Sequence, residues 1–338
     1  MKSRNNFVDV IRGFAMLMVV LGHTLSGSTT EYQNSYLFQM IWTLQMPLFI
    51  IISGYVTRYS RPITCLQEFY YFIKKRTLAY LLPWLVWTII VRGLIFNETN
   101  FLNIKYLLWH MDSGYWFLVT IWTISIIYGF SNYLSYRFSN HLYKSIFFHI
   151  IFCLFGMILL VVIALFLGWG FFSIKLTLYY LPLFLLGYIY GQIQDNFLSR
   201  KNARSILYVV SSITLVIWFS FITRYDFFAA GDNGLFVLFR FCTSVLGCIS
   251  VISLFYGAYG LKAKKLFLWS GIHSLEIYLG HYLFLNILKM TENQALVSLE
   301  GFTILVLNFS LTVVCTSVFI KLIQRNNILN YFLYGKHV

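Results

Sequence analysis

Charged residues are scarce in this chain of 338 residues. They make up 11% of the sequence, whereas 59% of the residues are hydrophobic and 20% are aromatic. A soluble domain carries about 25% charged residues, and no water-soluble core could bury this much apolar surface. The composition therefore excludes a soluble globular protein and indicates one whose solvent is the lipid bilayer.

Features of several other classes of protein are also lacking. The seven histidines show no metal-ligand spacing, and there is neither a Gly-rich phosphate loop nor a Gly-x-Ser-x-Gly elbow, so we expect no bound metal. Only one of the five cysteines, Cys65, lies outside the apolar stretches, so we expect five free thiols. Because no repeat, linker or low-complexity tract divides the sequence, we expect a single transmembrane domain over residues 1–338, without a soluble extracytoplasmic domain.

Apolar stretches of about 20 residues, each long enough to cross a hydrocarbon core about 30 Å thick, fill most of the chain. Short polar or basic loops separate them, which predicts an all-α integral membrane protein. The amphipathic segment 101–111 is expected to lie along the outer interface or to re-enter the membrane. We predict a bundle of about ten transmembrane helices, at residues 7–27, 36–57, 76–96, 115–134, 145–168, 174–193, 204–223, 235–258, 266–288 and 299–322.

The basic residues are distributed unevenly over the predicted loops. Of the 25 Lys and Arg residues, 18 fall on the side of the N-terminus, four on the opposite side and three within spans. The positive-inside rule then puts both termini in the cytoplasm. The net charge of +14 reflects this topology and contact with anionic lipid head groups, and because the basic residues are dispersed, we expect no nucleic-acid partner. Asp9 and Arg12 interrupt the first apolar stretch, so we expect it to be retained rather than removed as a signal peptide.

Arg12 and His23 are ionisable residues within the first predicted span. They are 11 residues apart, which on a helix of about 100° per residue returns them to within about 20° of one face, about 16 Å apart along the axis. Ionisable groups within a span are costly and normally face a cavity or a partner. The pair therefore indicates a functional site, although Arg12 could instead contact lipid phosphate while His23 is a satisfied interfacial histidine.

Three neighbours of this pair are also candidates for a role. Asp9 lies three positions before Arg12, close enough for an ion pair that orients the guanidinium, or it is a helix-start charge stabilised by the helix dipole. Gly13 and Gly22 allow a neighbouring helix or a ligand to approach closely at each end of the stripe.

The second and third predicted spans contain a second group of candidates. Pro47 should kink the second span, and the backbone groups that a kink frees must be satisfied by neighbours or a ligand, so Ser53 is a candidate binding residue, with packing as the alternative. Lys74, Lys75 and Arg76 stand at the predicted start of the third span. Such a cationic cluster can hold a phosphorylated co-substrate, and a topogenic anchor explains it equally well.

The ninth predicted span holds an acid and three polar residues at helical spacing. Ser274, Tyr278 and His281 would share one face of a helix. Glu276 is the least ambiguous intramembrane acid and needs a partner, for which Arg12, Arg240 or a histidine could serve. A purely structural ion pair is the alternative to a functional one.

The order of these segments resembles that of the acyltransferase family 3 membrane proteins. Arg12-Gly13 leading to Leu21-Gly22-His23 looks like the family's Arg-x10-His motif. One position departs from the family: its basic run often carries a second arginine where this sequence has Ala79. Further matches, in family order, are Met46-Pro47-Leu48-Phe49 with Ser53-Gly54-Tyr55, the basic run ending at Arg76 before Pro83, Tyr115-Trp116-Phe117-Leu118, Leu181-Pro182-Leu183-Phe184-Leu185-Leu186-Gly187-Tyr188 and Ser274-Leu-Glu-Ile-Tyr-Leu-Gly-His281.

The resemblance implies transfer of an acyl group, usually acetyl from cytoplasmic acetyl-CoA, to a hydroxyl of a surface glycan or its lipid-linked precursor. We therefore expect a membrane O-acetyltransferase in the inner membrane of a bacterium, acting on a polysaccharide such as O-antigen, capsule or exopolysaccharide. Acetyl-CoA would be its co-substrate, with no bound cofactor. The expected partners are acetyl-CoA, the glycan acceptor and membrane lipids, and the sequence leaves open a homo-oligomer.

The resemblance also suggests roles for the candidate residues. His23 would be the central group, either as a general base that removes the proton from a sugar hydroxyl or as a transient acyl carrier. Arg12, with Lys74, Lys75 and Arg76, would bind the CoA phosphates or stabilise developing negative charge. The remaining candidates for binding substrate are Asp9, Ser53, Trp116, Glu276, Tyr278 and His281, and Trp116 and Tyr115 could stack on a sugar ring.

Two rival functions follow from the same residues. An exporter of a glycan or small anion could use buried Arg, Glu and His side chains along its path, but the sequence shows no convincing inverted repeat and no pair of broken helices in corresponding halves. The other rival remains an enzyme, an O-succinyltransferase or an acyltransferase that acts on another small acceptor.

Overall fold

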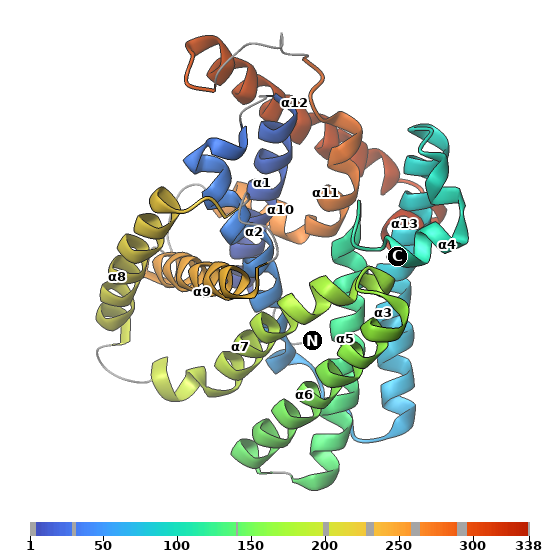
Figure 1. The fold of residues 1–338 in the computed structure, drawn as a ribbon, viewed down its shortest axis with the longest axis vertical. Helices are drawn as coiled ribbons and strands as arrows, with labels where there is room; N and C mark the ends of the chain where they lie inside the picture. The colour runs from blue at the N-terminus through green and yellow to red at the C-terminus, as the bar shows by residue number, and fades with distance from the viewer. Residues whose placement is uncertain are drawn as a thin grey trace. The chain divides into compact units, whose positions relative to one another are not determined.

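A computed structural model describes residues 5–28, 32–139, 141–198, 203–227, 233–257, 264–288 and 296–336. Every regular element in these ranges is a helix, so the all-α prediction is confirmed (Figure 1). Within the described residues nine helices are long and apolar enough to cross a membrane, which makes this a multi-pass membrane protein. They are Asn6–Ser28, Tyr36–Tyr59, Leu66–Ile95, Trp116–Phe138, Leu142–Leu167, Phe171–Asp195, Ser205–Arg224, Gly234–Tyr256 and Leu299–Ile323.

The chain forms two compact units. The first comprises Met1–Ile52 and Gln192–Leu322, and the second comprises Ser53–Gly191 and Ile323–Val338. Helices α2 (Tyr36–Val56), α7 (Ile174–Leu198) and α12 (Leu299–Ile323) each contain residues of both units. The expectation of one domain over residues 1–338 stays a prediction.

Helix α1 (Asn6–Ser28) is central to the first unit. It packs against α10 (Lys264–Ile272) and α11 (Ser274–Gly280), while α8 (Ala203–Arg224) and α9 (Gly234–Gly257) lie side by side (Figure 1). Buried residues occur along the whole of α1, from Val8 to Ser28. A helix buried along its length packs against protein rather than lipid.

Two glycines let α1 and α10 touch through their backbones. A Cβ atom at Gly13 would overlap the carbonyl oxygen of Phe267, and a Cβ atom at Gly271 would overlap the carbonyl oxygen of Asp9. Helices in lipid associate by close van der Waals packing, and small residues at the crossing make that packing possible. The close approach that Gly13 predicts is therefore confirmed, and α10 is the neighbouring helix.

The second unit contains α3 (Leu66–Val86), α5 (Trp116–Phe138) and α6 (Leu142–Leu167), and α5 packs against both of the others. Helix α3 begins ten residues before the predicted span 76–96, so the prediction that Lys74 to Arg76 stand at a helix start is wrong. The carboxylate of Glu68 accepts hydrogen bonds from the backbone N–H and the hydroxyl of Thr64, at 2.7 and 2.8 Å, and thereby closes the first turn.

Helix α3 continues as a π-helix, η3 (Trp87–Ile95), four residues after Pro83. A proline lacks an N–H and crowds the turn that precedes it, whereas the π-helical stretch begins in the turn that follows Pro83. The indole N–H of Trp87 donates a hydrogen bond of 2.9 Å to the carbonyl oxygen of Leu333 in α13 (Asn327–Tyr334), a helix that the sequence did not predict.

The predicted span 266–288 is not one continuous helix. Helix α10 ends at Ile272, α11 follows from Ser274 to Gly280, and a 3₁₀ turn, η6 (His281–Phe284), completes the segment. The expectation of an unbroken ninth span is therefore wrong, and this segment is not among the nine long helices of the described residues. The amphipathic segment 101–111 forms the end of η4 (Thr99–Leu102) and the short helix α4 (Ile104–Trp109).

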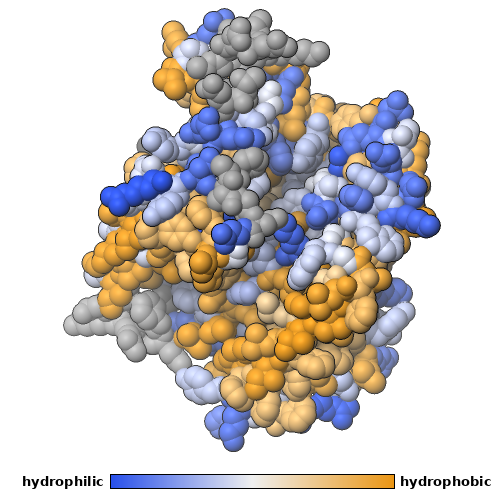
Figure 2. All heavy atoms as spheres, viewed as in Figure 1, coloured by the Kyte–Doolittle hydropathy of each residue, from blue (hydrophilic) through white to orange (hydrophobic). Residues whose placement is uncertain are grey.

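Helix α6 contains the most apolar stretch of the long helices, 18 residues with a mean hydropathy of 3.3. Large apolar side chains such as Phe155 and Phe166 are exposed along it, and the space-filling view shows apolar surface over this part of the chain (Figure 2). Such a surface fits contact with lipid tails. The cytoplasmic position of both termini stays a prediction, and several basic residues behind it lie outside the described residues: Lys2, Arg4, Arg200, Lys201, Lys262 and Lys289.

Candidate active site

His23 is in contact with the segment that follows α11. The hydroxyl oxygen of Tyr282 lies 3.1 Å from Nε2 of His23 and 3.5 Å from Nδ1. The ring of His281 lies 5.3 Å from the ring of His23 and 4.4 Å from that of Tyr282, measured between centroids. Two imidazoles and one phenol therefore form a cluster within the first unit.

His281 is completely buried, and its backbone surroundings define which ring nitrogen carries a proton. Its Nδ1 lies 2.9 Å from the carbonyl oxygen of Ile277, one helical turn earlier. A carbonyl oxygen only accepts hydrogen bonds, so Nδ1 carries the proton and Nε2 of the neutral ring is an acceptor. Among the described residues this buried Nε2 has no hydrogen-bond partner.

The polar side chains of α12 hold this non-helical segment in place. Thr312 donates a hydrogen bond of 2.8 Å to the carbonyl oxygen of Phe284, and the side chain of Asn308 bonds both the N–H and the carbonyl oxygen of Leu288, each at 2.9 Å. Ser28 at the end of α1 donates to the side chain of Asn286 at 3.1 Å. Backbone that leaves a helix at membrane depth must be satisfied by neighbours, and these side chains do so.

Glu276 is fully buried and has a histidine as its partner. Its Oε1 lies 3.2 Å from Nδ1 of His273, the residue that separates α10 from α11. The expectation that an arginine or a histidine would serve Glu276 is thus confirmed for the histidine. Tyr278 follows Glu276 by two residues and is also buried. The centroid of its ring lies 6.3 Å from that of the His281 ring.

Arg12 and Asp9 lie toward the other end of α1. Asp9 is buried, with 3% of its surface exposed, and Arg12 is half-buried. The carbonyl oxygen of Asp9 is the one that Gly271 approaches, so Asp9 belongs to the crossing of α1 and α10. The ion pair between Asp9 and Arg12 stays a prediction.

The other predicted site residues belong to the second unit. Lys74 and Lys75 are exposed, whereas Arg76 donates a hydrogen bond of 3.0 Å to the hydroxyl of Tyr80. Trp116 is stacked on Tyr180 with 5.4 Å between ring centroids. Ser53 is half-buried in α2. The structure thus groups His23, His281 and Tyr278 in one unit, and Ser53, Lys74, Lys75, Arg76 and Trp116 in the other.

Sequence reasoning missed one residue of the cluster, Tyr282, and the histidine that pairs with Glu276. Tyr282 was not distinguished among 25 tyrosines, although it directly follows His281. His273 was overlooked because the predicted span 266–288 was treated as one helix, and its spacing of three residues from Glu276 was the available signal.

The cluster can bind a hydroxyl group and move its proton. Neutral imidazole nitrogens accept protons, and a phenol can donate or accept, so a hydroxyl of a bound substrate placed beside His23 would find an acceptor. Among the described residues, no group of three or more His, Cys, Asp and Glu side chains could hold a metal ion. The fold and this cluster define a multi-pass membrane protein with a polar centre of two histidines and a tyrosine.

The family of the chain is shown by a comparison with family models. An acyltransferase domain, that of acyltransferase family 3, matches residues 5–321. The chain belongs to this family and is a membrane acyltransferase, so the resemblance found in the sequence is confirmed. No curated protein and no solved structure matches the chain.

Proposed function

We propose that this protein is an O-acetyltransferase that moves an acetyl group from cytoplasmic acetyl-CoA to a hydroxyl of a surface polysaccharide or its lipid-linked precursor in a bacterial inner membrane. The contact of 3.1 Å between His23 and Tyr282, beside His281, is the observation that carries the proposal. Membership of an acyltransferase family supports it over an exporter.

His23 acts as the proton acceptor in the simplest mechanism. A sugar hydroxyl attacks the thioester carbonyl of acetyl-CoA, and an imidazole nitrogen of His23 takes the hydroxyl proton as the new C–O bond forms. The C–S bond then breaks, and the CoA thiolate leaves with the proton that His23 returns. General-base catalysis of this kind contributes about 10² to 10⁴ in rate.

A second mechanism uses His23 as an acyl carrier. The imidazole displaces CoA to give an acyl-imidazole, and the sugar hydroxyl then displaces the imidazole. Tyr282 orients the ring in either mechanism, and Nε2 of His281, an acceptor without a partner among the described residues, is available to the attacking hydroxyl.

Donor binding is assigned to the cationic side chains. Lys74 and Lys75 are exposed, as contact with the phosphates of a soluble CoA requires, and Arg76 beside them offers a planar donor. Arg12 stabilises negative charge or binds phosphate. Asp9, Ser53, Trp116, Glu276 and Tyr278 are proposed to shape the acceptor and donor sites.

The test is transfer of label from acetyl-CoA in membranes that contain the protein and the glycan precursor. We expect labelled glycan, release of free CoA and loss of both in His23→Ala. Movement of unlabelled glycan across the membrane would indicate an exporter, and label only from succinyl-CoA would indicate an O-succinyltransferase. Label on the protein that neutral hydroxylamine releases, absent in His23→Ala, would identify the acyl-carrier mechanism, because an acyl-imidazole is labile.

A further inference from the structure

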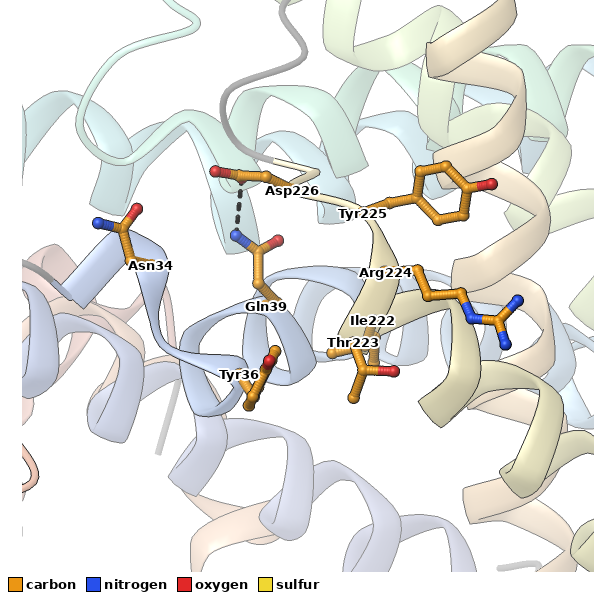
Figure 3. A pocket seen from close by; sticks show the side chains of 8 residues that line it. All are labelled: Asn34, Tyr36, Gln39, Ile222, Thr223, Arg224, Tyr225 and Asp226. Atoms are coloured by element: carbon orange, nitrogen blue, oxygen red, sulfur yellow. Dashed lines mark hydrogen bonds between the residues drawn. The ribbon is translucent and has the colours of Figure 1, made fainter.

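A polar hollow lies in the first unit between the start of α2 and the end of α8 (Figure 3). Its volume is about 200 Å³, and its lining is formed by Asn34, Tyr36, Gln39 and the stretch from Ile222 to Asp226. None of these residues takes part in the histidine cluster described above. The hollow is therefore a separate feature that the acyl-transfer chemistry does not explain.

Gln39 lines the hollow and is held in place by hydrogen bonds. Only 3% of its surface is exposed, and all of its hydrogen-bonding groups are directed by the protein. Its amide nitrogen donates to the carbonyl oxygen of Gln33 at 2.9 Å and to Oδ1 of Asp226 at 2.8 Å, the latter drawn in Figure 3, and its oxygen accepts from the N–H of Phe227 at 3.0 Å. These bonds fasten the carboxylate of Asp226 to α2.

The lining combines the two kinds of group that recognise a sugar. Asn34, Arg224 and Asp226 offer planar donors and acceptors for pairs of hydroxyls, and Tyr36 and Tyr225 offer aromatic faces for the apolar C–H side of a sugar ring. Arg224 makes no hydrogen bond or ion pair with any described residue, so its guanidinium is available to a ligand.

The size of the hollow selects among ligands of the proposed reaction. Pockets for drug-sized ligands occupy roughly 300 to 1,000 Å³, so a volume of about 200 Å³ fits one sugar ring and not CoA. The expected topology also favours a sugar over CoA as the ligand. The loops that follow the first and seventh predicted spans, which form the hollow, are both expected on the outer face, whereas CoA is cytoplasmic.

Helix geometry places the hollow near the level of His23 in the membrane. A Cβ atom at Gly22, next to His23, would lie 2.9 Å from the side chain of Ile41 in α2. Tyr36 is five residues before Ile41, about 7.5 Å along the helix axis. A glycan with one ring in the hollow would therefore need to extend by only a turn or two of helix to reach the depth of His23.

We infer that this hollow is a glycan-binding subsite, which holds a sugar ring of the acceptor polysaccharide while another ring is acylated at His23. The inference rests on the proposed function for its choice of ligand. It assigns to Asp226, Arg224 and Tyr36 the recognition of the glycan rather than the transfer of the acyl group, with Gln39 positioning Asp226.

The binding test uses the full-length protein in lipid nanodiscs and de-O-acetylated oligosaccharides released from the surface polysaccharide of the cells that make it. Saturation-transfer NMR and titration give the affinity. We expect Arg224→Gln and Tyr36→Ala each to weaken binding at least fivefold. Both side chains are exposed, so these variants should fold. Tyr208→Ala, which removes an exposed tyrosine of α8 outside the hollow, should bind as the wild type does.

A parallel assay of label transfer from acetyl-CoA separates the two proposals. His23→Ala should lose transfer and keep oligosaccharide binding, whereas Arg224→Gln should raise the KM for the glycan and leave the KM for acetyl-CoA unchanged. Unchanged binding in Arg224→Gln and Tyr36→Ala, or no saturable binding to the wild type, would overturn the subsite. Binding that depends on Arg224 in a protein that transfers no label would leave the subsite standing and refute the acetyltransferase.

Discussion

The hydroxyl of Tyr282 lies 3.1 Å from Nε2 of His23, across a separation of 259 residues in the sequence. Nothing else among the described residues hydrogen-bonds the His23 ring. Because an imidazole can turn about its χ2 bond, this contact restricts the orientation of the His23 ring.

Replacing Tyr282 should reduce acyl transfer without abolishing it. Tyr282→Phe keeps the ring packed against His281 and removes only the hydroxyl, and one hydrogen bond is worth about 0.5–1.5 kcal/mol, which corresponds to a roughly 2- to 12-fold lower kcat. His23→Ala should cost about 10²- to 10⁴-fold. Tyr208→Phe is the matched control. Equal kcat values for Tyr282→Phe and the control would show that the hydroxyl does not orient His23.

His281 should be required for transfer through its Nε2. In His281→Asn the amide can still donate to the carbonyl oxygen of Ile277, but the acceptor at Nε2 is gone. We expect a folded protein with a large loss of kcat. His149→Asn is the control, because His149 is also fully buried but lies in the second unit. It should affect thermal stability rather than turnover, and an active His281→Asn would remove His281 from the mechanism.

Replacing either glycine at the crossing of α1 and α10 with alanine should destabilise the protein. In Gly13→Ala and Gly271→Ala the new Cβ meets backbone rather than a flexible side chain, so each should lower the free energy of unfolding by about 1–3 kcal/mol or more. Gly234→Ala is the control, since no described atom lies within 4 Å of its Cβ position. Alanine also favours a helix over glycine there.

A thiol-reactive dye would report this unfolding. Cys153 and Cys248 are buried free thiols, one in each unit, whereas Cys65 is exposed just before α3 and reacts at once. The melting temperature from the slow thiols should fall for Gly13→Ala and Gly271→Ala. Unchanged melting in both would mean that the helices can separate without cost.

The lysines of α3 should govern the donor and not the acceptor. Lys74→Gln with Lys75→Gln should raise the KM for acetyl-CoA roughly 2- to 5-fold, because exposed ion pairs contribute about 0.2–1 kcal/mol. The effect should vanish at high salt. Lys144→Gln, another exposed lysine, should leave KM unchanged, and an equal KM in the double variant would favour a purely topogenic role.

Some site residues could be predicted from the sequence alone, because burying an ionisable side chain in a membrane costs free energy. His23, Arg12 and Glu276 stand out because an ionisable group in an apolar stretch needs a partner or a cavity. Gly13 was recognised as a point of close approach because a glycine within a span lets a neighbouring helix come near. Its counterpart Gly271 was not, because which two helices cross depends on contacts between segments far apart in the chain.

The missed features arise where local signals are weak. The break at His273 leaves no proline or charge cluster in the sequence. The non-helical backbone further on is held by Asn308 and Thr312 of α12, which donate hydrogen bonds to the carbonyl oxygens of Leu288 and Phe284 and are distant in the sequence. The early start of α3 was missed because its first turns are polar and amphipathic, so a search for apolar stretches begins only at Arg76.

The separation of 259 residues between His23 and Tyr282 also sets a delay between the synthesis of the two residues. A ribosome adds about 5–20 residues per second, so His23 is made roughly 13 to 52 seconds before Tyr282. During that interval the α1 backbone at Gly13 and Asp9 has no α10 to cross. The proposed catalytic centre is thus one of the last parts of the protein to assemble, and a chain cut short before residue 282 carries His23 without the phenol that contacts it.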